Sequence, residues 1–386
     1  MMDRVGRIKM PGTLLMGIGA VSELAKSVES LGGRRVLVVA DPGIVQAGVV
    51  DKVNAVLEAK QIAVSVYDGV ESDPRLEIVS DCAERARQAG ADVLIGVGGG
   101  SSLDIAKVAA IVVRHGGPVQ RFFGIGNTPG RGLPTIVLPT TAGTGSEVTP
   151  IAVLSDEAEK LKKGIVSDDL YPDISIVDPG LMVSAPPSVT AYTGMDTLTH
   201  AIEAYTSRYS LPFVDTLALE AIRLVGRHLR RTVSNGSDLE ARSGMALAST
   251  YGGMCLGPVN TAAVHALAYP LGGTYHVAHG QANALLLPYV MEFNFPSDMC
   301  KFAEVAKALG EKIEGLSLRD AALASVKAVR ELSIDINLPQ KMREFSIPED
   351  AIPEMAEAAM KVTRLLNNNP RTVRIDDVRR IYEQAH

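Results

Sequence analysis

Asp196 and His200 are the first pair of residues whose types and spacing could do chemistry. They lie in residues 194–205, which read GMDTLTHAIEAY. On a helix, residues four apart share one face, with their Cβ atoms about 5–6 Å apart. This spacing suits a carboxylate and an imidazole that bind one divalent cation. Taken alone, the same spacing is also common in a hydrogen-bonded pair on a helix surface.

A second concentration of histidines lies in residues 264–282 (VHALAYPLGGTYHVAHGQA), where His265, His276 and His279 make up three of the seven histidines of the chain. His265 and His279 are fourteen positions apart, which on an unbroken helix would separate them by about 21 Å. Pro270 and the glycine pair after it predict an interruption that lets a second helix turn back, so that His279 meets His265. The return must be tight, because metal–imidazole bonds are about 2.0–2.1 Å long.

One carboxylate and three imidazoles would hold a borderline divalent ion and leave a position for a substrate. Fe(II) and Zn(II) both fit this donor set. The alternative is a group of core or interface histidines. Three observations favour the metal site. The Asp–His pair and the interrupted histidine segment occur in one chain, and the N-terminal half of that chain is suited to binding a cofactor.

The first half of the chain alternates short apolar runs with helical stretches, which predicts a parallel sheet covered by helices. Continuously apolar runs are typical of strands buried on both faces. Four such runs are residues 34–40, 91–97, 133–139 and 174–178. Helical spacing falls at residues 44–60 and 76–90.

The second half of the chain is rich in Ala, Leu, Met and Glu and predicts helices only. A proline pair, Pro186 and Pro187, can continue neither a helix nor a central strand, so we place the boundary there. The prediction is an α/β domain at residues 1–186 and an all-α domain at residues 187–386.

Residues 93–107 (VLIGVGGGSSLDIAK) predict a buried strand, a glycine turn and a helix. Glycines let backbone N–H groups approach phosphate oxygens, and a helix N-terminus offers free donors and partial positive charge. A pyrophosphate would fit this turn. The alternative is a plain strand-to-helix turn capped by serine. The usual G-x-G-x-x-G fingerprint is incomplete, since Ser101 stands at its third glycine position, and the chain contains no P-loop motif.

Two other segments could contact the same cofactor. Asp41 follows a predicted strand, where an acid can bind a ribose 2′-hydroxyl and repel a 2′-phosphate, which would favour NAD over NADP. It precedes the glycine turn in sequence, so the sheet is predicted to be a variant of the ordinary dinucleotide fold. Residues 139–149 (PTTAGTGSEVT) form a hydroxyl-rich loop after another predicted strand. The alternatives are a turn or cap role for Asp41 and a solvated loop for residues 139–149.

Composition narrows the class of function. The 386 residues carry a net charge of −6 without a basic block, which disfavours nucleic acid and anionic membranes as partners. No window approaches the roughly 18 apolar residues of a membrane span, and the first ten residues lack a signal-peptide core, so we expect a cytoplasmic protein with a small-molecule partner. The three cysteines, Cys82, Cys255 and Cys300, indicate neither disulfides nor a thiolate metal site.

Together, these motifs resemble those of the iron-containing (group III) alcohol dehydrogenases. The resemblance runs from about Gly12 to Tyr382 and rests on GGGSSLDIAK, PTTAGTGSEVT, GMDTLTHAIEAY and HALAYPLGGTYHVAHGQANALLLP, in the expected order. It implies a variant dinucleotide-binding domain, a helical C-terminal domain and an active site in the cleft between them. It also implies a homo-oligomer.

Motif matching carries the roles of the family's residues onto this chain. The implied metal ligands are Asp196, His200, His265 and His279. The implied NAD contacts are Gly98, Gly99, Gly100, Ser101, Ser102, Asp104, Thr140, Thr141 and Thr144. Lys162 falls where the family has a cofactor-contacting lysine, and Asp41 matches the acid that marks a preference for NAD.

This chain departs from the family pattern at two positions. Many members have a further histidine four residues after the ligand matched by His265, where this chain has Tyr269. His276 lies nearby in sequence, so Tyr269 and His276 are the candidates for passing on the hydroxyl proton, besides a ribose hydroxyl or water. Ile151 stands where some diol-using members have asparagine, which predicts a less polar pocket.

The predicted function is reversible hydride transfer between the carbinol carbon of a small primary alcohol or diol and C4 of NAD, with the metal as Lewis acid. Alternatives are an enzyme of the glycerol dehydrogenase or dehydroquinate synthase type and a non-catalytic NAD-binding protein. Enzymes of the glycerol dehydrogenase and dehydroquinate synthase types bind their metal through other patterns of ligand residues. The alcohol, the physiological metal and the direction of the reaction stay open at this point.

Overall fold

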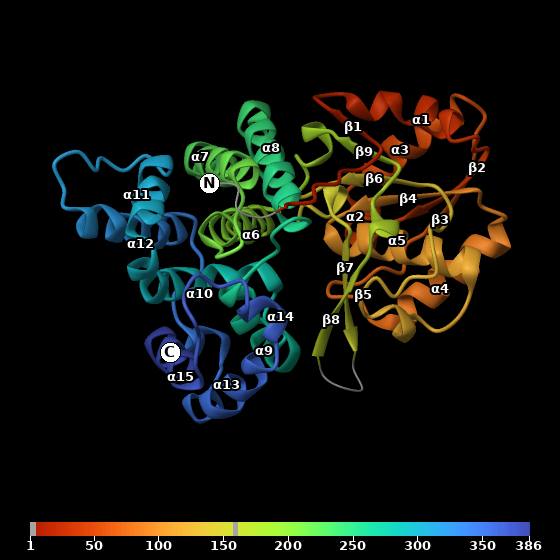
Figure 1. Ribbon diagram of the computed structural model, residues 1–386. Helices are drawn as coiled ribbons and strands as arrows, with labels where there is room; N and C mark the ends of the chain where they lie inside the picture. The colour runs from red at the N-terminus through yellow and green to blue at the C-terminus, as the bar shows by residue number, and fades with distance from the viewer. Residues whose placement is uncertain (1–4, 157–160) are drawn as a thin grey trace. The chain divides into compact units, whose positions relative to one another are not determined.

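The computed structural model describes residues 5–156 and 161–386, which form two compact units (Figure 1). One unit is Lys9–Ala185. The other comprises Pro186–His386 together with residues 5–8. The division falls at the proline pair, where neither a helix nor a strand of the first unit can continue.

The first unit is built on a six-stranded sheet in the order β1-β9-β6-β4-β2-β3, with every neighbouring pair parallel. Its strands are β1 (Thr13–Met16), β2 (Arg35–Val39), β3 (Ala63–Tyr67), β4 (Val93–Gly98), β6 (Thr135–Pro139) and β9 (Ile174–Val177). The four predicted strands are the four interior ones, β2, β4, β6 and β9. The edge strands β1 and β3 carry no fully buried side chain and lack the signal that marks the other four.

Helices cover both faces of this sheet (Figure 1). Alternate side chains of β2 divide between two cores: Leu37 lies in one and Val36 in the other. The first core packs against α4 (Leu76–Ala89) and α5 (Gly100–His115). The second packs against α1 (Leu24–Ser30) and α3 (Val49–Glu58). Burial on both faces explains why these strands are continuously apolar.

One helical prediction for the first unit needs correction. The stretch 44–60 is not one helix but two, α2 (Pro42–Gln46) and α3. Gly48 separates them with a φ of 71°, a left-handed conformation that a continuous helix cannot contain.

The same unit contains a small sheet that the sequence pattern did not indicate. Its order is β5-β8-β7, with β5 (Gly124–Ile125) parallel to β8 (Leu161–Val166), and β8 antiparallel to β7 (Ile151–Asp156). The strand β8 reads LKKGIV, which has no continuous apolar run. This sheet is therefore recognisable only from the hydrogen-bonded pairing of its strands in the structure.

In the second unit, every long element that the structure describes is a helix. Its helices are α6 (Pro187–Thr206), α7 (Pro212–Ser234), α8 (Leu239–Leu256), α9 (Ala263–Tyr275), α10 (His279–Asn294), α11 (Met299–Ala308), α12 (Leu318–Asp335), α13 (Ile352–Met360), α14 (Thr363–Leu366) and α15 (Ile375–Ala385). The helix α6 packs against α7, α8, α9 and α10, and most of its side chains are buried. None of the described helices combines the length and apolar content that crossing a bilayer requires.

The predicted fold class, a parallel α/β N-terminal domain and a helical C-terminal domain, is confirmed.

Candidate active site

Three helices of the second unit bring a carboxylate and three imidazoles to one point. Asp196 and His200 lie one turn apart on α6, His265 lies on α9, and His279 is the first residue of α10. The Oδ1 atom of Asp196 is 3.7, 3.6 and 3.8 Å from the Nε2 atoms of His200, His265 and His279. Two ligands of one ion, each about 2.0–2.2 Å away from it, lie at most about 4.4 Å apart. These spacings therefore fit a shared divalent ion.

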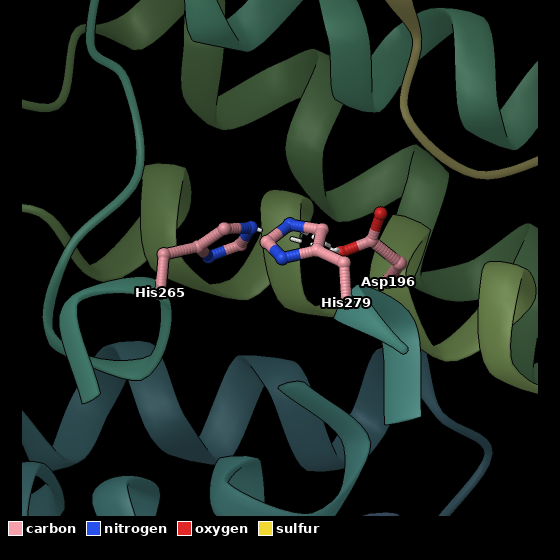
Figure 2. Close-up of side chains that lie close together, drawn as sticks. All are labelled: Asp196, His265 and His279. Atoms are coloured by element: carbon pink, nitrogen blue, oxygen red, sulfur yellow. Dashed lines mark ion pairs between the residues drawn. The ribbon is translucent and has the colours of Figure 1, made fainter. Parts of the chain in front are cut away.

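Figure 2 shows Asp196, His265 and His279 pointing toward one another; their ligand atoms all lie within 4.8 Å of each other. His200 joins this group through Asp196 and by stacking on His265, with ring centroids 4.9 Å apart and planes 18° apart. The structure thus brings together all four residues that the motifs assign as ligands.

The chain reversal that joins α9 to α10 does not occur where the sequence predicts it. Pro270 lies inside α9, which continues to Tyr275. The helix ends at His276, whose φ of 55° is the left-handed conformation that terminates many helices. The N–H group of Val277 then donates to the carbonyl oxygen of Leu271, and α10 begins at His279. The interruption by Pro270 is a wrong prediction, although the return of His279 to His265 is correct.

Glu203 supports the site and was not singled out from the sequence. Its buried carboxylate accepts hydrogen bonds from the backbone N–H groups of Ala262 and Val264 at 2.9 and 2.6 Å. It also lies 2.6 Å from Nδ1 of His265. A proton held on Nδ1 leaves Nε2 with the lone pair that a metal needs. The helical spacing of Glu203 from Asp196 and His200 was the available signal.

Electrostatics favour the charged form of this cluster. Burial raises the pKa of Asp196, but His200, His279 and His265 outweigh it and hold the pKa well below its usual range. Burial lowers the pKa of His265, but the carboxylates of Glu203 and Asp196 outweigh burial and raise it to about 9. A divalent cation has to displace the proton that these carboxylates favour, so binding is expected to release protons.

Asn283 is a further residue of the site that was not predicted from the sequence. It lies one turn after His279 on α10 and is fully buried. Its Nδ2 donates to Oδ1 of Asp196 at 2.7 Å. The four-residue spacing that marks Asp196 and His200 also marks His279 and Asn283.

Of the two proton-relay candidates, Tyr269 lies in the middle of α9 and His276 is the residue that ends it. Tyr269 is one turn after His265; burial raises its pKa, Arg364 lowers it, and Glu203 raises it. His276 is exposed at the end of the helix. His276 is not among the described residues whose ligand atoms cluster with Asp196.

The first unit places its three predicted cofactor segments side by side. Asp41 follows β2, Gly98 ends β4 and Thr140 follows β6, and these three strands are neighbours in the sheet. The N–H group of Thr140 donates to the carbonyl oxygen of Gly98 at 2.9 Å. Gly98 has a φ of 150°, and a Cβ there would lie 2.8 Å from Cβ of Ser102 and 3.3 Å from Oδ2 of Asp41. This close approach requires glycine.

The N-terminus of α5 has no side-chain cap. Its N-cap residue is Gly99, which has no side chain, so the helix is not capped by serine. The hydroxyls of Ser102 and Thr140 are buried and have no hydrogen-bond partner within the described part of the chain. Thr141 lies against Gly99, and Thr144 against Gly100. Unpaired buried donors beside a helix N-terminus fit a pyrophosphate.

Asp104 and Lys107 connect α5 to the hydroxyl-rich loop. Asp104 accepts from the hydroxyl of Ser146 at 2.5 Å and from the N–H group of Val153 at 2.8 Å. Lys107 is fully buried; its Nζ donates to the hydroxyl of Ser146 and the carbonyl of Ile151, both at 2.7 Å, and lies 3.4 Å from Asp104. Burial lowers the pKa of Lys107, although Asp104 opposes this. These contacts hold the loop in place. This role of Lys107 was not predicted from the sequence.

The two remaining predicted cofactor residues already have protein partners. Asp41 caps α2 by accepting from the N–H group of Ile44 at 3.1 Å, and its other oxygen is the one beside Gly98. The Nζ atom of Lys162 lies 2.7 Å from Oδ1 of Asp73, and the lysine side chain is 6% exposed.

Comparison with known proteins covers nearly the whole chain. Family models for the iron-containing alcohol dehydrogenase and for the C-terminal part of the Fe-containing alcohol dehydrogenase family match residues 11–179 and 190–386. Long-chain-alcohol dehydrogenase 1 of Geobacillus thermodenitrificans (strain NG80-2) is 43% identical over 384 residues, which cover 99% of this chain and 97% of the relative. The 1,3-propanediol dehydrogenase of Klebsiella pneumoniae is 40% identical over 378 residues, which cover 97% of each.

Solved structures agree with these sequence relatives. A crystal structure of 1,3-propanediol oxidoreductase matches with a TM-score of 0.96 at 40% identity, covering 99% of this chain and 100% of that chain. Sulfoacetaldehyde reductase from Bifidobacterium kashiwanohense in complex with NAD+ matches with a TM-score of 0.90 at 30% identity, covering 99% of each.

The fold and the site define an oxidoreductase of the dehydrogenase class. The chain belongs to the iron-containing alcohol dehydrogenase family. The predicted family and the predicted activity class, an alcohol and aldehyde oxidoreductase, are confirmed.

Proposed function

We propose that this protein is a metal-dependent, NAD-linked alcohol dehydrogenase and aldehyde reductase. It transfers a hydride reversibly between the carbinol carbon of a small primary alcohol or diol and C4 of nicotinamide. The observation that carries the proposal is the set of three imidazole Nε2 atoms within 3.8 Å of one carboxylate oxygen, Oδ1 of Asp196.

The residues that would hold the metal are Asp196, His200, His265 and His279. Fe(II) and Zn(II) both suit one carboxylate and three imidazoles. Such an ion supplies Lewis acidity toward a hydroxyl or carbonyl oxygen. The chain itself contributes preorganisation, because Glu203 orients His265 and burial keeps competing water from Asp196.

NAD is proposed to bind at the carboxyl edge of the first unit's sheet. Its pyrophosphate would lie on the turn Gly98, Gly99, Gly100, Ser101 and Ser102, beside Thr140, Thr141 and Thr144. Asp41 would bind a ribose 2′-hydroxyl and repel a 2′-phosphate. Asp104 acts by fixing the loop, and Lys162 is proposed to face the cofactor from β8. Bound NAD supplies the hydride acceptor.

Tyr269 and His276 are proposed to pass on the hydroxyl proton. Tyr269 lies one helical turn after His265, on the same face of α9. Because burial raises the pKa of Tyr269, its phenol stays protonated at neutral pH, so it would relay a proton by accepting one at its oxygen and giving up its own to the next acceptor. His276 is exposed and would exchange the proton with solvent.

A primary alcohol or diol is proposed because the relatives named above act on long-chain alcohols and on 1,3-propanediol. The proposed use of NAD supports a cytoplasmic location, and the family resemblance supports a homo-oligomer, which light scattering of the purified protein tests.

The deciding experiment is anaerobic turnover of a panel of alcohols and aldehydes by stripped protein, with Fe(II) or Zn(II) restored and NAD compared with NADP. We expect net NADH formation from a primary alcohol only after metal is restored. His265→Ala should remove metal retention and turnover while leaving NAD affinity unchanged. Turnover by the fully stripped protein, or by His265→Ala, would contradict the proposal.

A further inference from the structure

The amide of Asn283 lies where the ligand atoms of the metal centre converge. Its Nδ2 atom is 2.7 Å from Oδ1 of Asp196, 3.1 Å from Nε2 of His265 and 3.2 Å from Nε2 of His279. The same three atoms face one another in the cluster, since Oδ1 of Asp196 lies 3.6 and 3.8 Å from Nε2 of His265 and Nε2 of His279. One amide nitrogen therefore contacts an atom from each of α6, α9 and α10.

The chemistry of these contacts matches what a cation would require. An amide NH2 group has two N–H donors and no acceptor. The short bond to Asp196 is charge-assisted and independent of the histidine tautomers. The second N–H group points toward Nε2 of His265 and Nε2 of His279 and can donate to one of them at a time or be shared between them. The three side chains are thereby gathered around one amide nitrogen.

A cation and the Asn283 amide nitrogen compete for the same three atoms. An ion about 2.0–2.2 Å from each of them would lie within contact distance of Nδ2. The amide N–H groups carry partial positive charge and would be repelled by the cation, so the Asn283 side chain has to move when the ion binds.

Packing alone does not explain an asparagine at this position. The side chain is fully buried, and its Oδ1 has no partner within the described part of the chain. An unpaired buried polar atom costs about 1–3 kcal/mol, which an apolar side chain of similar volume would avoid. The contacts of the amide nitrogen with Asp196, His265 and His279 therefore explain why an asparagine stands here.

We propose that Asn283 is a positioning residue of the metal centre. It holds the donors of Asp196, His265 and His279 together while no ion is bound, and it yields that place to the incoming ion. This inference rests on the proposed metal-dependent function. Removing the amide should weaken metal binding, because the protein must then order the donors at the moment of binding.

The test compares Asn283→Ala with Asn294→Ala in the full-length chain. Asn294 is the matched control, since it is also a buried asparagine of α10 and its amide pairs with Asn369 at 2.8 Å. Affinity for Zn(II) is measured by chelator competition on stripped protein whose folding is checked by circular dichroism. We expect Asn283→Ala to weaken Zn(II) binding about 10- to 100-fold and Asn294→Ala to leave it within about twofold.

Asn283→Asp is a second variant that keeps the shape of the side chain. A carboxylate cannot donate to Asp196 and places a like charge beside it, so the Tm of the metal-free protein should fall. Zn(II) should then raise the Tm by more than it does in the parent chain.

The two proposals fail in different ways. If the parent chain binds no divalent ion, the proposed metal-dependent function fails, and this inference fails with it. If the parent binds Zn(II) and Asn283→Ala binds it equally or more tightly, the role of Asn283 is overturned while the metal centre stands. An unchanged metal-free Tm in Asn283→Asp likewise overturns the role.

Discussion

Glu203 lies 2.6 Å from Nδ1 of His265, while the other ring nitrogen of His265 faces Asp196 at 3.6 Å. The two carboxylates belong to one helix, α6, and lie on opposite sides of one imidazole. One of them orients the ring, and the other shares its proposed metal. The helix α6 therefore supplies both a ligand and the group that prepares a ligand of another helix.

Glu203→Gln tests this arrangement. An amide is a weaker acceptor than a carboxylate and can present its NH2 group, so His265 loses part of its orientation. We expect about 10- to 100-fold weaker metal retention, measured as bound metal after dialysis against a chelator. Glu220→Gln, which changes an exposed glutamate of α7 paired with Arg223, is the control and should retain metal like the parent. Equal retention in both variants contradicts the orienting role.

Gly280→Ala tests how α10 is held against α6. A Cβ at Gly280 would lie 2.5 Å from the carbonyl oxygen of Tyr192, so α10 must shift and carry His279 away from Asp196. We expect a loss of about 1–3 kcal/mol in the free energy of unfolding and weaker metal binding. Gly252→Ala on α8 is the control, because its nearest neighbour, the carbonyl oxygen of Thr197, is at an ordinary 3.5 Å. Denaturant titration distinguishes them, and equal stability would refute the shift.

Lys107→Met tests the buried connection between α5 and the hydroxyl-rich loop. Removing the ammonium leaves Asp104 without its cationic partner and frees the loop at Ser146. We expect about 3–5 kcal/mol lower stability and a higher Kd for NAD, measured by denaturant titration and calorimetry. Lys52→Met, at an exposed position of α3, should change neither quantity. If NAD binds the folded Lys107→Met protein with parental affinity, the loop does not depend on this lysine.

Asp41→Ser tests the choice of cofactor while preserving the cap of α2. Serine can still accept the bond from Ile44, since serine and aspartate are comparable N-cap residues. Loss of the negative charge should raise kcat/KM for NADP relative to NAD by about tenfold, which corresponds to removing roughly 1.4 kcal/mol of repulsion. Steady-state kinetics with both cofactors give the ratio, and an unchanged ratio would exclude Asp41 as the discriminating residue.

Local pattern was sufficient for the interior strands and for the first ligand pair. The strands β2, β4, β6 and β9 are recognisable because burial on both faces leaves a continuous apolar run. Asp196 and His200 are recognisable because a helix brings residues four apart onto one face. Both signals depend only on residues close together in the chain. The order of the motifs that indicates the family is also read directly from the sequence.

Tertiary packing decided the rest. Asp41 meets Gly98 only because β2 pairs with β4, although 57 residues separate them in the chain. The turn before His279 forms at His276 instead of Pro270, and α9 continues through its proline with Pro270 and Leu271 buried. Glu203 and Asn283 acquire their roles from partners on other helices. The sequence by itself determines which groups can bind a metal, whereas long-range burial determines which of them share one point and what orients them there.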